Sequence, residues 1–315
     1  MRKYYILFLL TIIGYSCKNK LESETDLKPT YLNFKNAWQE RNLYGKVKKL
    51  KQYKATIQNN KNTNKQQLTL KENFTEFGSL TRSEFFNNYG ETTQVDKFYY
   101  NEKEYLIKSV STNYQANRKT IQLFSYDTIM KTSTRSLTIN DTVNYTFIST
   151  FNNDDQIIKQ VRIDRKDTIV RTYEYKYDQN KIIFEKEFEK GKEISVGTYK
   201  YDNENQLTKY RTKNEWIELL TVNNWADNRI LKQTKYKILP DSRKYLDEIT
   251  EYDKLFNPLD SKIYNNSELH RELKYDYEFD GFGNWIKRTV SMKEHFANSN
   301  EFVPIYIEFR EIKYW

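Results

Sequence analysis

Aromatic and polar residues alternate along much of the chain in short runs with a period of two. Tyr173, Tyr175 and Tyr177 are separated by single polar residues, and similar runs end at Tyr201 and at Phe279. A period of two places the rings on one face of a β-strand. Each run stops at a polar stretch that usually begins with Asp or Asn. This is turn chemistry, because an Asx side chain bonds the backbone two residues further on.

These runs form an internal repeat. Its template is Tyr201-Asp202, a polar stretch and then Leu207, six places after the aromatic residue. Copies start at positions 74, 100, 126, 151, 177, 201, 225, 252 and 279. A unit of about 26 residues has room for two strands and two turns, so nine units predict an all-β protein, a long antiparallel meander of about 18–20 strands.

An open twisted sheet rarely exceeds about ten strands without curling. We therefore expect the meander to curl into a trough, an open barrel or a shell. Its apolar face is expected to turn inward and its Lys/Glu face outward. The pattern leaves open whether the sheet closes into a barrel.

The first residues have the pattern of a signal peptide. A basic start at Met1 to Lys3 precedes an apolar and aromatic run of about ten residues, which is shorter than the roughly 20 residues of a membrane-spanning helix. The run leads into Gly14-Tyr15-Ser16-Cys17, which resembles a bacterial lipobox, where the cysteine receives a lipid. Ordinary cleavage after Ser16, leaving an unmodified cysteine, is the alternative. Because Cys17 is the only cysteine, we predict that it is the site of lipid attachment.

The chain is therefore divided into a signal peptide at residues 1–16, a lipid-anchored tether at 17–30 and a single β-repeat domain at 31–315. The tether is polar, charged and closed by Pro29. This organisation predicts a membrane partner through the N-terminal lipid anchor. The expected location is the outer membrane, on its periplasmic or its cell-surface face.

The best copy of the repeat carries a family resemblance. Residues 279–285 read Phe-Asp-Gly-Phe-Gly-Asn-Trp, which resembles the YD repeats of the rearrangement-hotspot (RHS) family, whose units read aromatic-Asp-x-x-Gly-x-Leu and build β-hairpins. With the lipobox ahead of it, the chain is similar to RHS-repeat-like lipoproteins of the Bacteroidetes type over residues 44–290. Only Gly78 and Gly283 stand at the family's glycine position. The resemblance implies no enclosed toxin, because the peptidase-like core and toxin tip of large RHS proteins are absent.

Composition narrows the possible partners. Aromatic residues make up 16% of the chain, so a folded β protein is expected although hydrophobic residues reach only 37%. The formal charge of +9 arises from 52 basic and 43 acidic residues that interleave along the chain. A charge spread so thinly does not predict a nucleic-acid partner. A glycan or an envelope protein remains a possible partner.

No motif for catalysis, cofactor binding or metal binding is found. A phosphate loop and a nucleophile elbow are both missing, and His270 and His295 stand 25 places apart on weakly patterned sequence. We read both histidines as solvated side chains and most acidic residues as turn or outer-face groups. We predict a protein that is not an enzyme and needs no cofactor.

The sequence thus indicates a cell-envelope lipoprotein that acts as a structural or interaction scaffold. The alternative is a carbohydrate- or ligand-binding module using aromatic residues on the sheet face. Trp216 follows a predicted turn and is expected to be exposed, whereas Trp225 and Trp285 occupy repeat positions that predict core packing. Trp38 and Trp315 complete the set of tryptophans.

Overall fold

The computed structural model describes residues 37–58, 61–62, 66–166, 168–295 and 301–315. This part of the chain holds one four-residue helix, α1 (Ala37–Glu40), followed by 21 strands in a single sheet. The predicted signal peptide at 1–16 and the tether at 17–30 with Cys17 lie outside the described residues. No described helix is long and apolar enough to cross a membrane.

The strands have the following bounds: β1 (Val47–Gln58), β2 (Lys61–Asn62), β3 (Gln67–Phe74), β4 (Leu80–Phe86), β5 (Thr92–Tyr100), β6 (Leu106–Asn113), β7 (Arg118–Asp127), β8 (Thr132–Ile139), β9 (Thr142–Phe151), β10 (Ile157–Asp164), β11 (Ile169–Asp178), β12 (Lys181–Glu189), β13 (Lys192–Tyr201), β14 (Leu207–Asn214), β15 (Glu218–Ala226), β16 (Arg229–Ile238), β17 (Lys244–Tyr252), β18 (Pro258–Asn265), β19 (Glu268–Phe279), β20 (Trp285–Glu294) and β21 (Val303–Tyr314).

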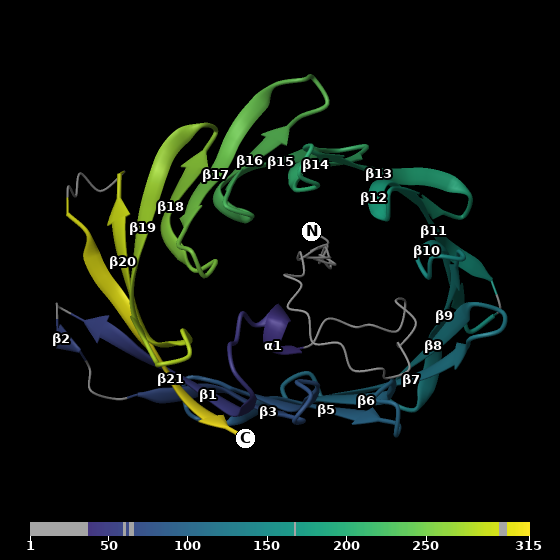
Figure 1. Cartoon of the computed structure of the whole chain (residues 1–315), viewed down its shortest axis with the longest axis horizontal. Helices are drawn as coiled ribbons and strands as arrows, with labels where there is room; N and C mark the ends of the chain where they lie inside the picture. The colour runs from purple at the N-terminus through teal and green to yellow at the C-terminus, as the bar shows by residue number, and fades with distance from the viewer. Residues whose placement is uncertain (1–36, 59–60, 63–65, 167, 296–300) are drawn as a thin grey trace.

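The sheet is a meander that closes on itself. Each strand from β3 onward pairs antiparallel with the next one along the chain, and β1 pairs with β3 on one side and with β21 on the other. Twenty strands, all except the short β2, therefore form a closed ring (Figure 1). The predicted all-β antiparallel meander is confirmed, and closure leaves no long unpaired edge among these strands.

The predicted Tyr-Asp turns all lie at one end of the barrel, because they are every second turn of the meander. Each joins an odd-numbered strand to the next even-numbered one, from β3 and β4 to β19 and β20. In the turn at 279–285, the Asp280 carboxylate accepts the N–H groups of Phe282 and Asn284, both at 2.9 Å. This confirms the Asx turn chemistry, which satisfies two backbone donors in this loop. The residues with the same i+2 and i+4 pattern at this end are Thr75, Asn101, Asn152, Asp202 and Asp253.

In six repeats, an aromatic residue shortly before the turn ties the repeat to the preceding one. The ladder between β4 and β5 ends at Arg82 and Lys97, so the carbonyl of Leu80 has no strand partner there. The Tyr100 hydroxyl donates to that carbonyl at 2.7 Å. The same kind of bond, spanning 18–20 residues, recurs in these pairs: Tyr126 to Leu106, Tyr177 to Ile157, Tyr201 to Ile182, Tyr277 to Pro258 and, through its indole N–H, Trp225 to Leu207.

Helix α1 reveals which side chains face the interior of the barrel. It lies inside the ring (Figure 1), and Arg41, directly after it, donates to Glu72 of β3 at 2.6 Å. Glu72 therefore points inward. Because residues paired across a ladder share one face, this assignment passes from strand to strand around the barrel.

The inner face is aromatic, as predicted, but it is not free of charge. Tyr173 and Tyr175 of β11 face inward, in register with Glu187 and Glu185 of β12. The expectation that charged side chains lie only outside is therefore wrong. A small barrel would press these side chains into a dry core, whereas a ring of this many strands is wide enough for the inner charges to stay partly hydrated.

Among the described residues, the apolar cluster of buried side chains sits where α1 packs on the barrel wall. Its described members are Ala37, Leu43, Val47, Leu50, Phe74 and Leu80. They join the segment before β1 to the first hairpin. The rest of the wall is held by its ladders and by contacts between side chains on each face.

The seam is the junction where the last strand, β21, pairs with the first, β1. The segment before β1 closes it and occupies the place of a further Tyr-Asp turn. Asn284 is 1% exposed and bonds both backbone groups of Tyr44, accepting from its N–H at 2.7 Å and donating to its carbonyl at 2.8 Å. It also donates to the Tyr314 hydroxyl at 2.7 Å. One turn asparagine thus joins the start, the last repeat and the end of the barrel.

Candidate functional site

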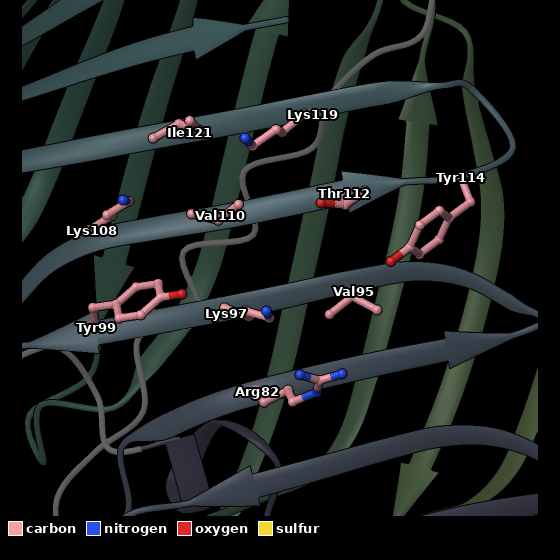
Figure 2. A pocket seen from close by; sticks show the side chains of 10 residues that line it. All are labelled: Arg82, Val95, Lys97, Tyr99, Lys108, Val110, Thr112, Tyr114, Lys119 and Ile121. Atoms are coloured by element: carbon pink, nitrogen blue, oxygen red, sulfur yellow. The ribbon is translucent and has the colours of Figure 1, made fainter. Parts of the chain in front are cut away.

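The outer face carries a shallow basic depression of about 360 Å³ on β4 to β7 (Figure 2). Arg82, Lys97, Lys108 and Lys119 contribute its cations, and short apolar side chains lie between them. Ser83 bonds the inward-facing Glu72 and therefore faces inward, so its neighbour Arg82 faces outward. The depression is open and has no acidic lining residue, so its chemistry is that of a solvated basic surface.

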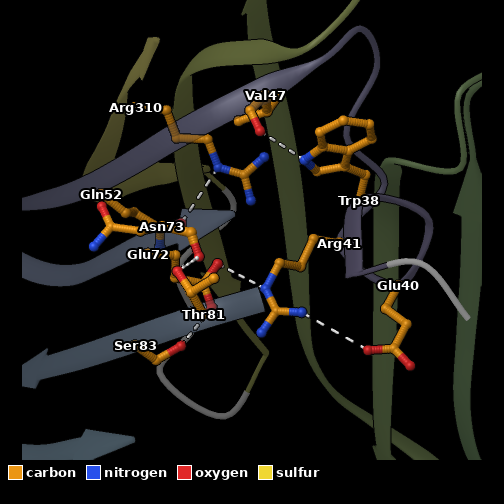
Figure 3. A network of polar contacts seen from close by, with 10 residues as sticks. All are labelled: Trp38, Glu40, Arg41, Val47, Gln52, Glu72, Asn73, Thr81, Ser83 and Arg310. Atoms are coloured by element: carbon orange, nitrogen blue, oxygen red, sulfur yellow. Dashed lines mark hydrogen bonds and ion pairs between the residues drawn. The ribbon is translucent and has the colours of Figure 1, made fainter. Parts of the chain in front are cut away.

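The inner face near α1 holds a dense polar network (Figure 3). Trp38 donates its indole N–H to the Val47 carbonyl at 2.8 Å, and Glu72, almost fully buried, accepts from Arg41 at 2.6 Å and from Ser83 at 3.0 Å. Each of these groups has a partner within the fold. We therefore assign this network to holding α1 against the wall.

Arg310 of β21 lies beside that network. Its guanidinium stacks on the Trp285 ring at 3.6 Å, and its Nε donates to Gln52 at 3.4 Å. Burial, together with the nearby Arg288 cation, lowers the pKa of Arg310 to about 9. Arg288 is paired with Glu308 at 2.7 Å, so this side of the barrel carries one compensated and one largely uncompensated cation.

The opposite wall carries a row of arginines in register, here called the arginine row: Arg135 of β8, Arg162 of β10 and Arg171 of β11. Phe147 of β9 is paired with both Arg135 and Arg162, and Arg162 is paired with Arg171. Phe147 thus separates the first two cations. All face inward, since Gln160, two residues before Arg162, is paired with the inward-facing Tyr173.

The three cations differ in their partners. Arg171 pairs with Glu187 and, at 3.4 Å, with Glu189. Arg135 and Arg162 have no carboxylate within 4.0 Å among the described residues. Each lies over an aromatic ring instead, Arg135 over Phe147 at 4.0 Å and Arg162 over Tyr145 at 4.7 Å. Burial lowers the pKa of Arg135. Within the described part of the chain, the arginine row therefore holds two cations without counter-ions.

Glu185 of β12 is a carboxylate of this wall that is partly shielded from water. Burial raises its pKa, although the hydroxyls of Tyr199 and Tyr210 bond its charged form, the latter at 3.2 Å. Its side chain lies across Gly197, where a Cβ would collide with it. Its raised pKa therefore reflects its enclosure within the wall, between these tyrosines and Gly197.

The tryptophans singled out from the sequence fall in different surroundings. Trp216 is 73% exposed in the turn before β15, as predicted, and Trp285 is buried, as predicted. Trp225 is half-buried and bonds the backbone of the preceding repeat. Trp315 is exposed, with the Lys48 ammonium over its ring at 4.2 Å. No two of these rings are brought together on one surface patch within the part of the chain that is described.

The two histidines are neighbours in space, which their sequence separation had hidden. The backbone N–H of His295 donates to the backbone carbonyl of His270 at 3.0 Å. The ring Nε2 of His295 lies 2.7 Å from the Glu272 carboxylate. Within the described ranges, no group of three or more His, Cys, Asp or Glu residues is placed to hold a metal ion.

The arginine row was missed at the level of sequence, although a signal exists. Arg171 shares the period-two phase of Tyr173 and Tyr175, so alternation alone places it on the aromatic face. The strands of Arg135 and Arg162 contain no aromatic residue, so their sequences give no such signal. The proximity of Arg162 and Arg171 depends on the pairing register of β10 and β11, which no single strand reveals.

The fold and its inner surface define the chain as a closed 20-stranded antiparallel barrel. No protein-family model matches it, and no curated protein matches its sequence. Among solved structures it is similar to a porin-like protein from Bacteroides uniformis ATCC 8492, with 12% identity and a TM-score of 0.34, covering 86% of this chain and 98% of that one.

The chain is also similar to parts of much larger toxin assemblies. The structure of TcdB2-TccC3-TEV matches 70% of this chain over 14% of its own length, with 12% identity and a TM-score of 0.35. The Photorhabdus luminescens Tc holotoxin pore matches 82% of this chain over 18% of its own length, with 10% identity and a TM-score of 0.26. Likenesses of this degree carry no information on activity.

Proposed function

We propose that the chain is a non-enzymatic lipoprotein of the cell envelope, a scaffold built as a closed shell of YD-like repeats. It belongs, in this proposal, with the RHS-repeat-like lipoproteins of the Bacteroidetes type. A lipid on Cys17 attaches it to the outer membrane, and the barrel itself stands in water. The lipobox-like residues, the repeat and the closed barrel support this proposal together.

The observation that carries the proposal is the charge on the outer face of the barrel. In the second half of β19, every outward-facing residue is charged: Glu272, Lys274, Asp276 and Glu278. In β14, the outward residues Lys209, Arg211 and Lys213 are all cations. A Lys or Arg on the lipid face of a membrane barrel costs about 2–4 kcal/mol at the bilayer midplane. A wall with such strands is suited to water on both faces, and its attachment to a membrane then needs an anchor.

The inner surface supports a role other than catalysis. Glu185 and Glu187 are the paired carboxylates of this wall, and neither is free: Glu185 is enclosed by tyrosines and Glu187 pairs with Arg171. An acid–base pair needs two carboxylates facing a substrate-sized space. We therefore propose binding or scaffolding without chemistry.

Replacement of the anchor residue tests the proposal. Cys17→Ala is expected to move the protein from the membrane fraction to the aqueous fraction, with the mass of the signal-cleaved chain. Ser16→Ala, which keeps a small residue before the cysteine, serves as the control and should remain membrane-bound. A signal-cleaved Cys17→Ala protein that stays in the membrane and needs detergent would mean that the barrel wall itself binds lipid.

A ligand-binding module is the second candidate function. It is favoured by the inner face, where aromatic rings and guanidinium groups alternate along neighbouring strands instead of forming a closed apolar core. Saccharides bind proteins by stacking the apolar faces of their rings on aromatic side chains and by hydrogen bonds to polar groups. Binding of any glycan by the mature protein, measured by calorimetry, tests this candidate.

A further inference from the structure

We propose that the arginine row on the inner face of β8 to β11 binds an acidic oligosaccharide, with Arg135 and Arg162 holding its carboxylates. The proposal deepens the second function given above and rests on it. It names the ligand class and the residues that would select it.

The first step is the imbalance of charge on this wall. Arg135 and Arg162 have no carboxylate within 4.0 Å in the described part of the chain, whereas Arg171, next in the row, has two. The nearest acid on the strand of Arg162 is Asp164, whose carboxylate accepts the N–H groups of Lys166 and Thr168 in its own turn. Asp164 is thus engaged by its own turn, and no described carboxylate forms an ion pair with either cation.

The second step is the set of unsatisfied donors. Three buried side-chain polar atoms lack a hydrogen-bond partner among the described residues, and all belong to inward-facing arginines: Nε of Arg162, Nε of Arg171 and Nη1 of Arg310. Two of the three lie in the arginine row. Buried donors without acceptors are costly, and a bound anion supplies the acceptors that the wall lacks.

The third step is geometry. One strand separates Arg135 from Arg162, so their backbones lie roughly 9–10 Å apart at the usual strand spacing. Arginine offers a planar fork that matches a carboxylate, and cations held on rings are already oriented. Two such forks separated by a ring fit a ligand that carries more than one carboxylate, rather than a single small anion.

The rings along the row favour a saccharide as the carrier of these carboxylates. Phe124 of β7 is paired with Arg135 on its other side, and Tyr173 of β11 lies next to the Arg171 end. Both are half-buried and so partly open to the interior. A uronic acid presents an apolar ring face and a carboxylate in one residue, which matches a wall where rings alternate with guanidinium groups.

The experiment uses the full mature chain in mild detergent, with an oligogalacturonate as the probe and isothermal titration calorimetry as the readout. Its fully methyl-esterified form keeps the sugar backbone and removes the charge. We expect the acid form to bind and the ester to bind at least tenfold more weakly. Arg135→Gln and Arg162→Gln should each weaken binding by roughly tenfold or more, as expected for a charge-assisted hydrogen bond.

The matched control is Arg211→Gln, on the outer face of β14, which should leave binding unchanged. Unaltered circular dichroism and thermal unfolding show that each variant is folded. Equal binding of acid and ester forms would overturn the acidic specificity and leave the second function standing. Binding of neither would overturn the arginine row as a site for acidic oligosaccharides, and the second function would then depend on the calorimetry with other glycans. Binding of poly-L-glutamate with equal strength, or an equal loss in Arg211→Gln, would overturn the assignment to this ligand or to this site.

Discussion

The hydroxyl of Tyr100 offers a test of how adjacent repeats are joined. Tyr100 is paired with Leu106 beside the bulge at the end of β5, and it donates to the Leu80 carbonyl across the break between two hairpins. Tyr100→Phe removes this one donor and leaves the ring. The Leu80 carbonyl then has no partner, because the β4–β5 ladder ends two residues before it.

The magnitude follows from that loss. A hydrogen bond contributes about 1 kcal/mol net, and an acceptor left without a partner in a half-buried site costs about 1–3 kcal/mol. We expect Tyr100→Phe to lower the free energy of unfolding by about 1–2 kcal/mol. For a domain of this size, the melting temperature should fall by about 2–5 °C.

The neighbouring residue supplies a matched control. Tyr99 stands on the same strand, faces outward and is 44% exposed, with only the Lys108 ammonium over its ring. Tyr99→Phe removes the same atom without breaking a bond in the fold, so its stability should change by less than about 0.5 kcal/mol. Both variants are measured by urea unfolding with far-UV circular dichroism.

A pH series adds a second readout. Burial, with a smaller contribution from Glu104, raises the pKa of Tyr100 to about 12 from its ordinary value of 10.0. Because the folded-state pKa is the higher one, the unfolded chain loses this proton first. Stability from this group is present below pH 10 and is lost as the pH rises toward 12. Tyr100→Phe should flatten that loss. Equal stability of the two variants, with equal alkaline slopes, would refute the idea that the phenol joins the repeats.

Three further substitutions probe the seam and the inner wall. Asn284→Ala should cost about 3 kcal/mol or more in denaturant unfolding, because the backbone N–H and carbonyl of Tyr44 lose their side-chain partner. Asn257→Ala, at the same place in the preceding turn, should cost about 1 kcal/mol, and equal losses would argue against a special role of the seam. Glu185→Gln should stabilise the protein at pH 7 and have little effect near pH 4, since a raised folded-state pKa makes stability fall as the pH rises; a loss at pH 7 would contradict this. Gly197→Ala should destabilise by about 1–3 kcal/mol by displacing the Glu185 side chain, and an unchanged melting temperature would show that the wall adapts.

The arrangement of strands was within reach of the sequence. Alternation with a period of two marks a strand, and an Asp or Asn such as Asp280 marks the turn, so the nine repeats predict the meander directly. Both signals are local. They act over about ten residues of one chain segment, and they need no knowledge of which strand lies next to which.

The role of the tyrosines was only half visible. Their rings were expected on the inner face, and Tyr175 and Tyr277 lie there. That the hydroxyl of Tyr277 bonds the carbonyl of Pro258, 19 residues earlier, depends on where one ladder stops and the next hairpin begins. This is a property of two hairpins placed side by side.

Strand order, turn positions and the phase of each strand were therefore determined by the sequence alone, because they follow from residue types a few places apart. Tertiary structure decided that β21 returns to β1, that Asn284 closes the seam, and that Arg135 and Arg162 face each other across Phe147. Closure depends on the twist and stagger summed over all strands, and facing pairs depend on register between strands. Neither quantity is encoded in any one segment.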